Sequence, residues 1–519
     1  MTFDAFFPLS TAETRFLEGL SIPGRTVFAG GDLPEAASDD NMLRAELLRA
    51  ALLHPNLPID AKGVRLRGAW VQGALDLQGI HCARDLTFSN CCFAEPANFV
   101  NAQLRGLHFS GCHLAGFSAD HAQFSGSLYI RGDSHVQGEI GLAGVRITGD
   151  LQLCGLRVES GGQDAVFAPG LCVDGSLFLG NYPYSDTDSS LVTEGALFFS
   201  SARIGHDVFI TRTAISVQEN GGSTTFGATE EHGAGIALSL ARAHVNGILY
   251  LSDNQISRGI VNFAGAYVTR LRDEPIGPGA SYPLRLDGFN YSDFSRHTDT
   301  TVAARLEWLE RRPDDMPFSA QPYEHLAGVL STLGHRTDAK TVLMHKERLL
   351  RVENRRLMAL EHKWAKYLFS AVIEPVLKYV VGYGYRPARA LFVSSLLVLL
   401  LGWFFGKAWD AGDMAPDAAP ILISANWISA TETYPDNPAK FWSSPGQAGQ
   451  DYETFHSYAY AADLLVPIVN LGQESAWAPS TSRSPWGWHG WWIRWFAKVA
   501  GWVITALAAG ALTGMIRSD

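Results

Sequence analysis

Leu75-Asp76-Leu77-Gln78-Gly79 shows the pattern that decides the fold: an apolar residue, any residue, a second apolar residue and then a glycine nearby. Apolar pairs of this kind return mostly at steps of ten to twelve residues through the centre of the chain. They include Leu86/Phe88, Leu107/Phe109, Phe117/Ala119, Leu128/Ile130, Ile140/Leu142 and Leu151/Leu153. Alternation with a period of two is typical of a short β-strand, and the fixed spacing indicates an internal repeat.

A strand of three or four residues cannot bury its apolar face alone, so the repeated units are expected to stack into one column with a shared core. The pattern begins near Gly63 and ends near Arg272, and Leu284 to Phe289 supplies one last strand-like element. We therefore predict a mainly β protein built on a right-handed β-solenoid over residues 63–290.

Charge argues against one class of partner. The 519 residues carry a formal net charge of −11, and no Lys/Arg face interleaved with aromatic residues runs through the repeats. Because nucleic-acid binding requires a basic field, we expect no nucleic-acid partner.

The cysteines and the N-terminus point to the cytoplasm. All six cysteines fall inside the predicted solenoid without C-x-x-C spacing, which favours reduced structural thiols over a zinc site. The start Met1-Thr2-Phe3-Asp4 lacks the basic and apolar regions of a secretory signal, so none is expected.

Residues 1–62 are predicted to form an N-terminal helical cap. Two helices are expected, Thr11–Leu20 and Asn41–Leu53, the second with Leu43, Leu47 and Leu48 on one stripe. A short amphipathic helix before Gly63 is well placed to cover the open edge of the first coil.

Three insertions interrupt the repeat, at residues 159–169, 181–191 and 217–233. They are rich in Gly, Ser, Thr, Asp and Asn, which predicts loops between strands. Loops on one edge of a rigid column suit a protein partner, and tolerated surface insertions fit the same composition equally well.

Helices are predicted after the solenoid. A cytoplasmic helical linker over residues 291–362 contains Val302–Arg311 and a hairpin of Pro322–Leu333 with Asp338–Leu360. Residues 363–388 are apolar but interrupted by charges, which suits an interfacial helix. We expect a set of basic residues around it to face anionic lipid: Arg351, Arg355, Arg356, Arg386 and Arg389.

Residues 389–519 are predicted to form a two-span α-helical membrane module. Ala390–Gly406 and Val499–Ile516 contain no charged residue, and each covers about 26 Å, enough for a bilayer core. Basic residues precede the first span, whereas residues 407–498 hold nine acids and five bases. The positive-inside rule then predicts a multi-pass protein of the bacterial inner membrane with both termini in the cytoplasm.

Between the spans, the apolar segment Tyr458–Leu471 is too short to cross the bilayer, so we consider a re-entrant half-helix. Span, short segment and span form the layout of a simple cation channel. The candidate pore residues are Asp463, Asn470, Gln473 and Glu474. For Asp463, a water-facing position on the outer surface is an equally good interpretation.

The run Val381-Gly382-Tyr383-Gly384 resembles a potassium-channel filter. It precedes the first span, however, so it cannot line a pore behind the 458–471 segment. We therefore interpret this run as a glycine-rich turn at the membrane interface.

Enzyme signatures are absent from the sequence. It contains no G-x-G-x-x-G between a strand and a helix, no G-x-x-x-x-G-K-[ST], no H-E-x-x-H and no G-x-S-x-G. We therefore predict no catalytic residue, no metal ligand and no cofactor.

Five runs of residues carry a resemblance to a known family. They are Leu43-Arg44-Ala45-Glu46-Leu47-Leu48 with Gly63-Val64-Arg65-Leu66-Arg67-Gly68-Ala69, Pro322-Tyr323-Glu324-His325-Leu326-Ala327, Gly382-Tyr383-Gly384-Tyr385-Arg386-Pro387, and Leu471-Gly472-Gln473-Glu474. Together they resemble bacterial membrane proteins with a pentapeptide-like β-helix, often labelled pentapeptide-repeat proteins or membrane-associated oxidoreductases. The resemblance covers nearly the whole chain and brings no catalytic residue with it. The units of about 11 residues depart from a strict five-residue repeat.

Three functions remain open from the sequence. The first is a cytoplasmic solenoid that senses or binds a partner and acts on a channel-like two-span module, which must assemble into a homo-oligomer because two spans cannot enclose a pore. The second is a membrane-tethered scaffold without transport. The third, suggested by the family label alone, is a membrane-associated oxidoreductase.

Overall fold

The computed structural model describes residues 6–22, 27–28, 31–54, 56–162, 164–185, 188–217, 235–275, 281–313 and 316–514. The chain divides into two compact units, Met1–Val342 and Leu343–Asp519, and each is described by itself.

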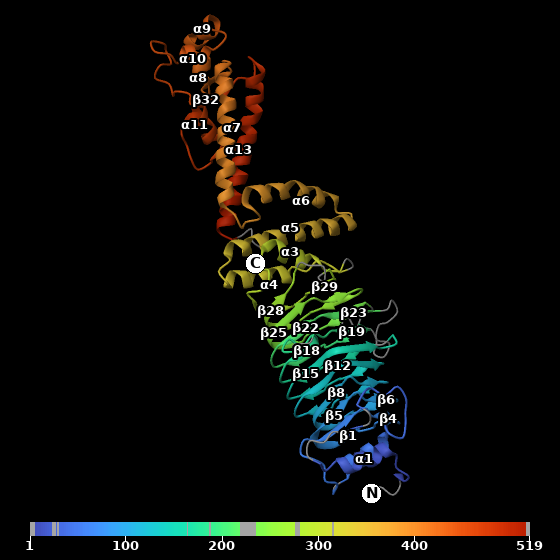
Figure 1. Ribbon diagram of the computed structural model, residues 1–519. Helices are drawn as coiled ribbons and strands as arrows, with labels where there is room; N and C mark the ends of the chain where they lie inside the picture. Colours follow the sequence, from blue (N-terminus) through green and yellow to red (C-terminus); the bar gives the residue numbers. More distant parts are fainter. Residues whose placement is uncertain are drawn as a thin grey trace. The chain divides into compact units, whose positions relative to one another are not determined.

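The first unit contains a β-solenoid of about nine turns, which confirms the predicted β-solenoid (Figure 1). All its strand pairs are parallel, and they form four ladders. The first ladder contains β3 (Val64–Arg67), β5 (His81–Ser89), β8 (Gln103–Ser110), β12 (Leu128–Gln137), β15 (Leu151–Glu159), β18 (Leu177–Gly180), β22 (Val208–Thr211), β25 (His244–Ser252), β28 (Tyr267–Asp273) and β30 (Asn290–Phe294). β1 (Val27–Phe28) pairs with β3.

Long strands of the first ladder bend and contribute to two others. The second ladder adds β11 (Gln123–Phe124), β14 (Arg146–Ile147), β17 (Cys172–Val173) and β21 (Arg203–Ile204). The third contains β2 (Met42–Arg44), β4 (Trp70–Gln72), β6 (Cys92–Phe93), β9 (His113–Leu114), β19 (Leu191–Glu194), β23 (Thr213–Ser216) and β26 (Gln255–Ile256).

The fourth ladder is a separate eight-stranded sheet. It contains β7 (Ala97–Asn98), β10 (Phe117–Ser118), β13 (Ile140–Gly141), β16 (Val166–Phe167), β20 (Leu197–Phe198), β24 (Ile236–Ser239), β27 (Ile260–Asn262) and β29 (Leu284–Arg285).

The sequence repeat is half of a coil. Leu107 pairs with Leu128 in the first ladder, whereas the intervening Phe117 pairs with Ile140 in the fourth ladder. Successive apolar pairs therefore alternate between two ladders, and only every second pair stacks. Leu107, Leu128 and Ile140 are fully buried, so both ladders supply one continuous core.

Two short helices precede the coils, α1 (Thr11–Gly19) and α2 (Ala45–Leu53). The predicted helix from Asn41 was too long, because Met42–Arg44 forms strand β2 and pairs with β4. Glu13 of α1 is fully buried and forms an ion pair with Arg44. Burial acts to raise the Glu13 pKa, but hydrogen bonds from Arg44 and from the backbone N–H of Ser10 bring the pKa below its usual value.

The three predicted insertions have different outcomes. In the 159–169 segment, Val166–Phe167 is strand β16 and pairs with β13 and β20, so that part of the loop prediction was wrong. Residues 181–190 connect β18 to β19, and the described part of this connection contains no strand or helix. The 217–233 insertion, apart from Val217, lies outside the described residues.

Two helices follow the last coil within the first unit, α3 (Val302–Glu310) and α4 (Gln321–Thr332). Arg305 of α3 is fully buried and donates two hydrogen bonds to the Asp273 carboxylate, at 2.9 and 2.7 Å. Its guanidinium also lies over the rings of Phe294 and Trp308. This buried ion pair joins α3 to strand β28 of the solenoid.

The second unit is helical. The boundary between the units falls inside α5 (Arg336–Leu360), which is followed by α6 (Trp364–Val376) and the π-helix η2 (Leu377–Val381). The long helices are α7 (Ala388–Asp410) and α13 (Pro485–Leu512), and both are long and apolar enough to cross a membrane. The second begins well before the predicted Val499, because the tryptophan-rich segment before it is also helical.

The Gly-Tyr-Gly segment lies in a turn between η2 and α7. Gly382, Tyr383 and Gly384 all have positive φ, a conformation that glycine adopts without strain. Tyr383 and Tyr385 are buried in a cluster with Val381 and Ile504. This geometry agrees with a turn before the first membrane-length helix.

The segment between α7 and α13 folds beside them (Figure 1). It contains β31 (Met414–Pro416), α8 (Ala419–Leu422), α9 (Ala425–Thr433), α10 (Pro438–Trp442), α11 (Ser457–Leu465), α12 (Gln473–Ala476) and β32 (Trp477–Pro479). β31 and β32 are antiparallel, and Trp427, Trp442, Tyr460 and Trp477 form the apolar core with residues of α7 and α13.

Candidate functional site

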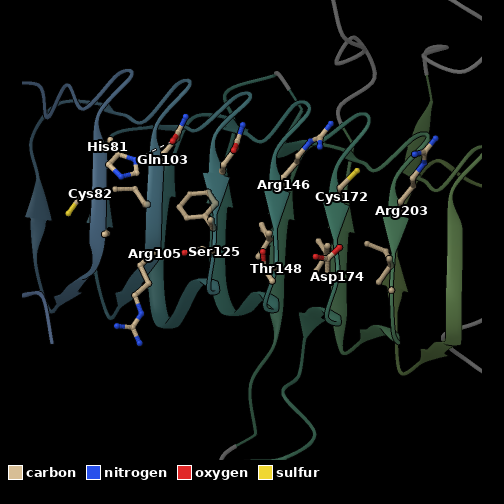
Figure 2. A pocket seen from close by; sticks show the side chains of 18 of the residues that line it. His81, Cys82, Gln103, Arg105, Ser125, Arg146, Thr148, Cys172, Asp174 and Arg203 are labelled. Atoms are coloured by element: carbon tan, nitrogen blue, oxygen red, sulfur yellow. Dashed lines mark hydrogen bonds between the residues drawn. The ribbon is translucent and has the colours of Figure 1, made fainter. Parts of the chain in front are cut away.

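A groove runs along the second ladder of the solenoid, with a cavity of about 740 Å³ (Figure 2). Strand pairing aligns Gln123 with Arg146, Arg146 with Cys172, and Cys172 with Arg203. Apolar residues such as Ile147 alternate with these positions and point into the core. The groove is therefore lined by one outward-facing side chain per coil, and we call this the groove row: His81, Gln103, Gln123, Arg146, Cys172, Arg203 and His244.

A second row lies two residues further along each strand. It contains Ala83, Arg105, Ser125, Thr148, Asp174, Gly205 and Asn246. Among the described residues that line the groove, Asp174 is the only acid, whereas three are arginines. The groove is thus more basic than the chain as a whole, whose net charge is −11.

The three arginines differ in their partners. Arg105 lies 3.7 Å from the Asp85 carboxylate. Arg146 and Arg203 are exposed, and within the described residues neither side chain makes a hydrogen bond or an ion pair. Figure 2 shows both side chains extending from the same edge of the ladder. These two guanidinium groups are available for a ligand.

A second cavity, of about 490 Å³, lies beside α13 in the second unit. Three of the four predicted pore residues line it, namely Asp463, Asn470 and Glu474. Arg494 and Lys498 of α13 complete the charged lining, together with Asp417. Lys498 forms an ion pair with Glu474, and Arg494 donates a hydrogen bond of 2.9 Å to Asp417.

Two of the predicted pore residues, Asp463 and Gln473, form hydrogen bonds with the backbone of neighbouring segments. The Asp463 carboxylate is buried and accepts hydrogen bonds from the backbone N–H groups of Leu471 and Glu474, at 2.8 and 2.9 Å. The Gln473 side chain is buried outside the cavity lining and bonds to Glu453. The water-facing interpretation of Asp463 was therefore wrong, because its carboxylate fixes the turn between α11 and α12.

The segment that contains Asp463 packs against both long helices. A Cβ at Gly402 of α7 would collide with the ring of Tyr458, and a Cβ at Gly501 of α13 would collide with the carbonyl oxygen of Leu465. Both glycines lie within the apolar stretches of their helices. After α11 the chain exposes apolar side chains, including Ile468 at 83%.

The basic residues expected to face lipid occupy different environments. Arg355 forms an ion pair with Glu374 of α6, and Arg351 lies over the ring of Tyr383. Arg356 is exposed, whereas Arg386 and Arg389 are half-buried. Arg389 donates a hydrogen bond to the backbone carbonyl of Lys378, and Arg356 lies 3.9 Å from the Glu353 carboxylate. At least four of the five basic residues thus contact groups within the unit.

Sequence reasoning missed Arg146 and Arg203 in the groove and the role of Arg494 and Lys498. If two successive repeats are taken together as one coil and the coils are aligned, Arg146 and Arg203 fall in the same row. The pairing of Arg494 and Lys498 with Asp417 and Glu474 depends on the fold of the segment between the helices, for which the sequence carries no repeat.

Among the residues that the structure describes, no group of three or more His, Cys, Asp or Glu side chains could hold a metal ion. Comparisons with protein-family models, curated proteins and solved structures found no match to this chain.

Proposed function

We propose that the protein is a membrane-anchored binding scaffold, in which α7 and α13 fix a β-solenoid to the inner membrane and the groove row binds a partner. The observation that carries this proposal is the combination, in one chain, of a basic groove along a solenoid with two membrane-length helices. Solenoids present side chains at regular intervals along an extended surface, which suits the binding of a partner. The two helices are long enough to anchor this surface to a membrane.

Exposed apolar surface supports the anchor. Leu391 and Phe392 of α7 are 74% and 72% exposed, and Phe496 of α13 is 74% exposed. Such side chains favour contact with lipid over contact with water. Trp364, Leu368, Phe369 and Val372 form an exposed stripe along α6. A helix of this kind suits the bilayer interface, with its apolar stripe in the acyl region.

The orientation is part of the proposal. We place both termini and the solenoid in the cytoplasm, because basic residues precede α7 and acids predominate between the two helices. The six cysteines are free, as expected in a reducing compartment.

Three finer features remain proposals. We infer a right-handed coil, because crossovers between parallel strands are usually right-handed. We infer that α1 and α2 cap the first coil, which the buried Glu13–Arg44 contact supports. The family resemblance stated above also stays a prediction, and no cofactor contact supports the oxidoreductase label.

A second candidate function is an oligomeric cation pore. The observation that favours it is the charged cavity beside α13, next to an α11 that packs on Gly402 and Gly501. Ionisable residues within a membrane-spanning unit often mark an ion pathway. Against it, Asp463 is already bonded to two backbone amides.

Ion flux separates the two candidates. We expect purified, folded protein in liposomes to conduct no ions, because the charges in the cavity are held in the ion pairs Lys498–Glu474 and Arg494–Asp417 or, for Asp463, by backbone N–H groups. Glu474→Gln should leave this result unchanged. Flux through the wild type that changes selectivity in Glu474→Gln or Asp463→Asn would contradict the scaffold and establish the pore.

A further inference from the structure

We propose that the groove row binds an extended acidic peptide in the polyproline II conformation, with two acidic side chains three residues apart. This inference rests on the proposed binding role of the solenoid and names the class of partner.

The spacing of the free arginines carries the inference. Arg146 and Arg203 occupy the groove row two coils apart, with Cys172 between them. Neighbouring parallel strands lie about 4.8 Å apart, so the two backbone positions are separated by about 9.6 Å. A ligand that engages both guanidinium groups therefore needs two anionic groups at about this distance.

A polyproline II helix meets this requirement. It rises about 3.1 Å per residue with three residues per turn, so side chains at positions i and i+3 lie on one face about 9.3 Å apart. In a β-strand, residues i and i+3 point to opposite faces. The spacing thus selects an acid, two intervening residues and a second acid in the polyproline II form.

The neutral groups of the groove fit the backbone of such a ligand. A polyproline II helix has no internal hydrogen bonds, so its carbonyl groups remain free to accept. Gln103 and Gln123 occupy the two coils before Arg146 and carry side-chain amide donors. The backbone of the second ladder is already paired between coils, so recognition must come from side chains.

The position of Asp174 argues against a uniform polyanion. It lies on the same coil as Cys172, between the coils of Arg146 and Arg203, and lines the groove. A negative charge at this level repels a third acid in the middle of the ligand. Two separated acids with neutral residues between them avoid this repulsion.

The test is peptide binding to the full-length protein in detergent or nanodiscs, measured by fluorescence anisotropy. The probe is a proline-rich peptide with Glu-Pro-Pro-Glu, compared with a peptide of identical composition and adjacent glutamates. We expect the spaced peptide to bind about tenfold more tightly, because only it forms both charge-assisted contacts.

Variants sharpen the test. Arg146→Gln and Arg203→Gln should each weaken binding about tenfold, and Asp174→Asn should strengthen it. Arg157→Gln is the matched control, since Arg157 is exposed on the third ladder and pairs with Glu159. Its binding should stay unchanged.

Several outcomes would overturn the proposal. Equal binding of the two peptides, or equal weakening by Arg157→Gln, would show non-specific attraction to a basic surface. Absence of binding, or tighter binding of an anionic polysaccharide that displaces the peptide, would reject a peptide ligand. None of these results bears on membrane anchoring, which extraction of the protein from membranes tests separately.

Discussion

Arg305→Ala is expected to destabilise the C-terminal coils of the solenoid by about 3–5 kcal/mol, because it leaves a buried charge without its partner. Arg305 is fully buried and its guanidinium donates two hydrogen bonds to the Asp273 carboxylate, which is itself 5% exposed. Without the guanidinium, Asp273 must remain charged in an apolar environment or take up a proton. Both alternatives cost free energy of folding.

Hydrogen exchange of strands β28 and β30 measures this effect locally, and chemical unfolding measures it globally. Arg270→Ala is the matched control, because Arg270 and Asp293 form an ion pair on the same strands with both side chains partly exposed. It should cost about 1 kcal/mol or less. The double variant Arg305→Leu/Asp273→Leu should recover much of the lost stability. Equal effects of Arg305→Ala and Arg270→Ala would contradict a special role for the buried pair.

Gly501→Val is expected to release α11 from α13. A Cβ added at Gly501 would overlap the carbonyl oxygen of Leu465. Because the obstacle is backbone, no side-chain rotation relieves the collision. Overpacking typically costs about 1–3 kcal/mol, and here the end of α11 must move away.

The expected readout is faster hydrogen exchange of α11 and faster proteolysis of the chain between α11 and α12, in protein that remains folded elsewhere. The control is Ala506→Val, which places the same valine side chain at an exposed position of α13. It should leave the protection of α11 unchanged. Wild-type protection of α11 in Gly501→Val would mean that this close approach does not hold the helix in place.

The solenoid was predictable because its signal is periodic. The pairs at Leu107, Leu128 and Leu151 are separated by a whole coil, and all three are buried in one ladder. It was harder to predict that each repeat forms only half of a coil. Phe117 and Ile140 show the same apolar alternation as the other pairs but belong to another ladder. Local alternation identifies a strand but does not identify the ladder to which it belongs.

The candidate sites were only partly predictable. Asp463 was identified because an acid is unusual in an apolar segment, and Glu474 because residues 470–474 follow that segment where a selectivity loop is expected; both line one cavity. Asp463 accepts hydrogen bonds from the backbone N–H groups of Leu471 and Glu474, whereas the Glu474 carboxylate pairs with Lys498 of α13. No spacing rule links Glu474 to so distant a position as Lys498. For Gln473, the sequence could not show that its amide is used to hold residues 453–456.

Membrane anchoring is tested most directly by alkaline carbonate extraction of membranes from cells that express the full chain. We predict that the protein stays in the membrane pellet and enters the soluble fraction only with detergent, as the proposed crossing of the bilayer by α7 and α13 requires. Release of the intact protein by carbonate alone would contradict the anchor and assign both helices to the core of a peripheral protein.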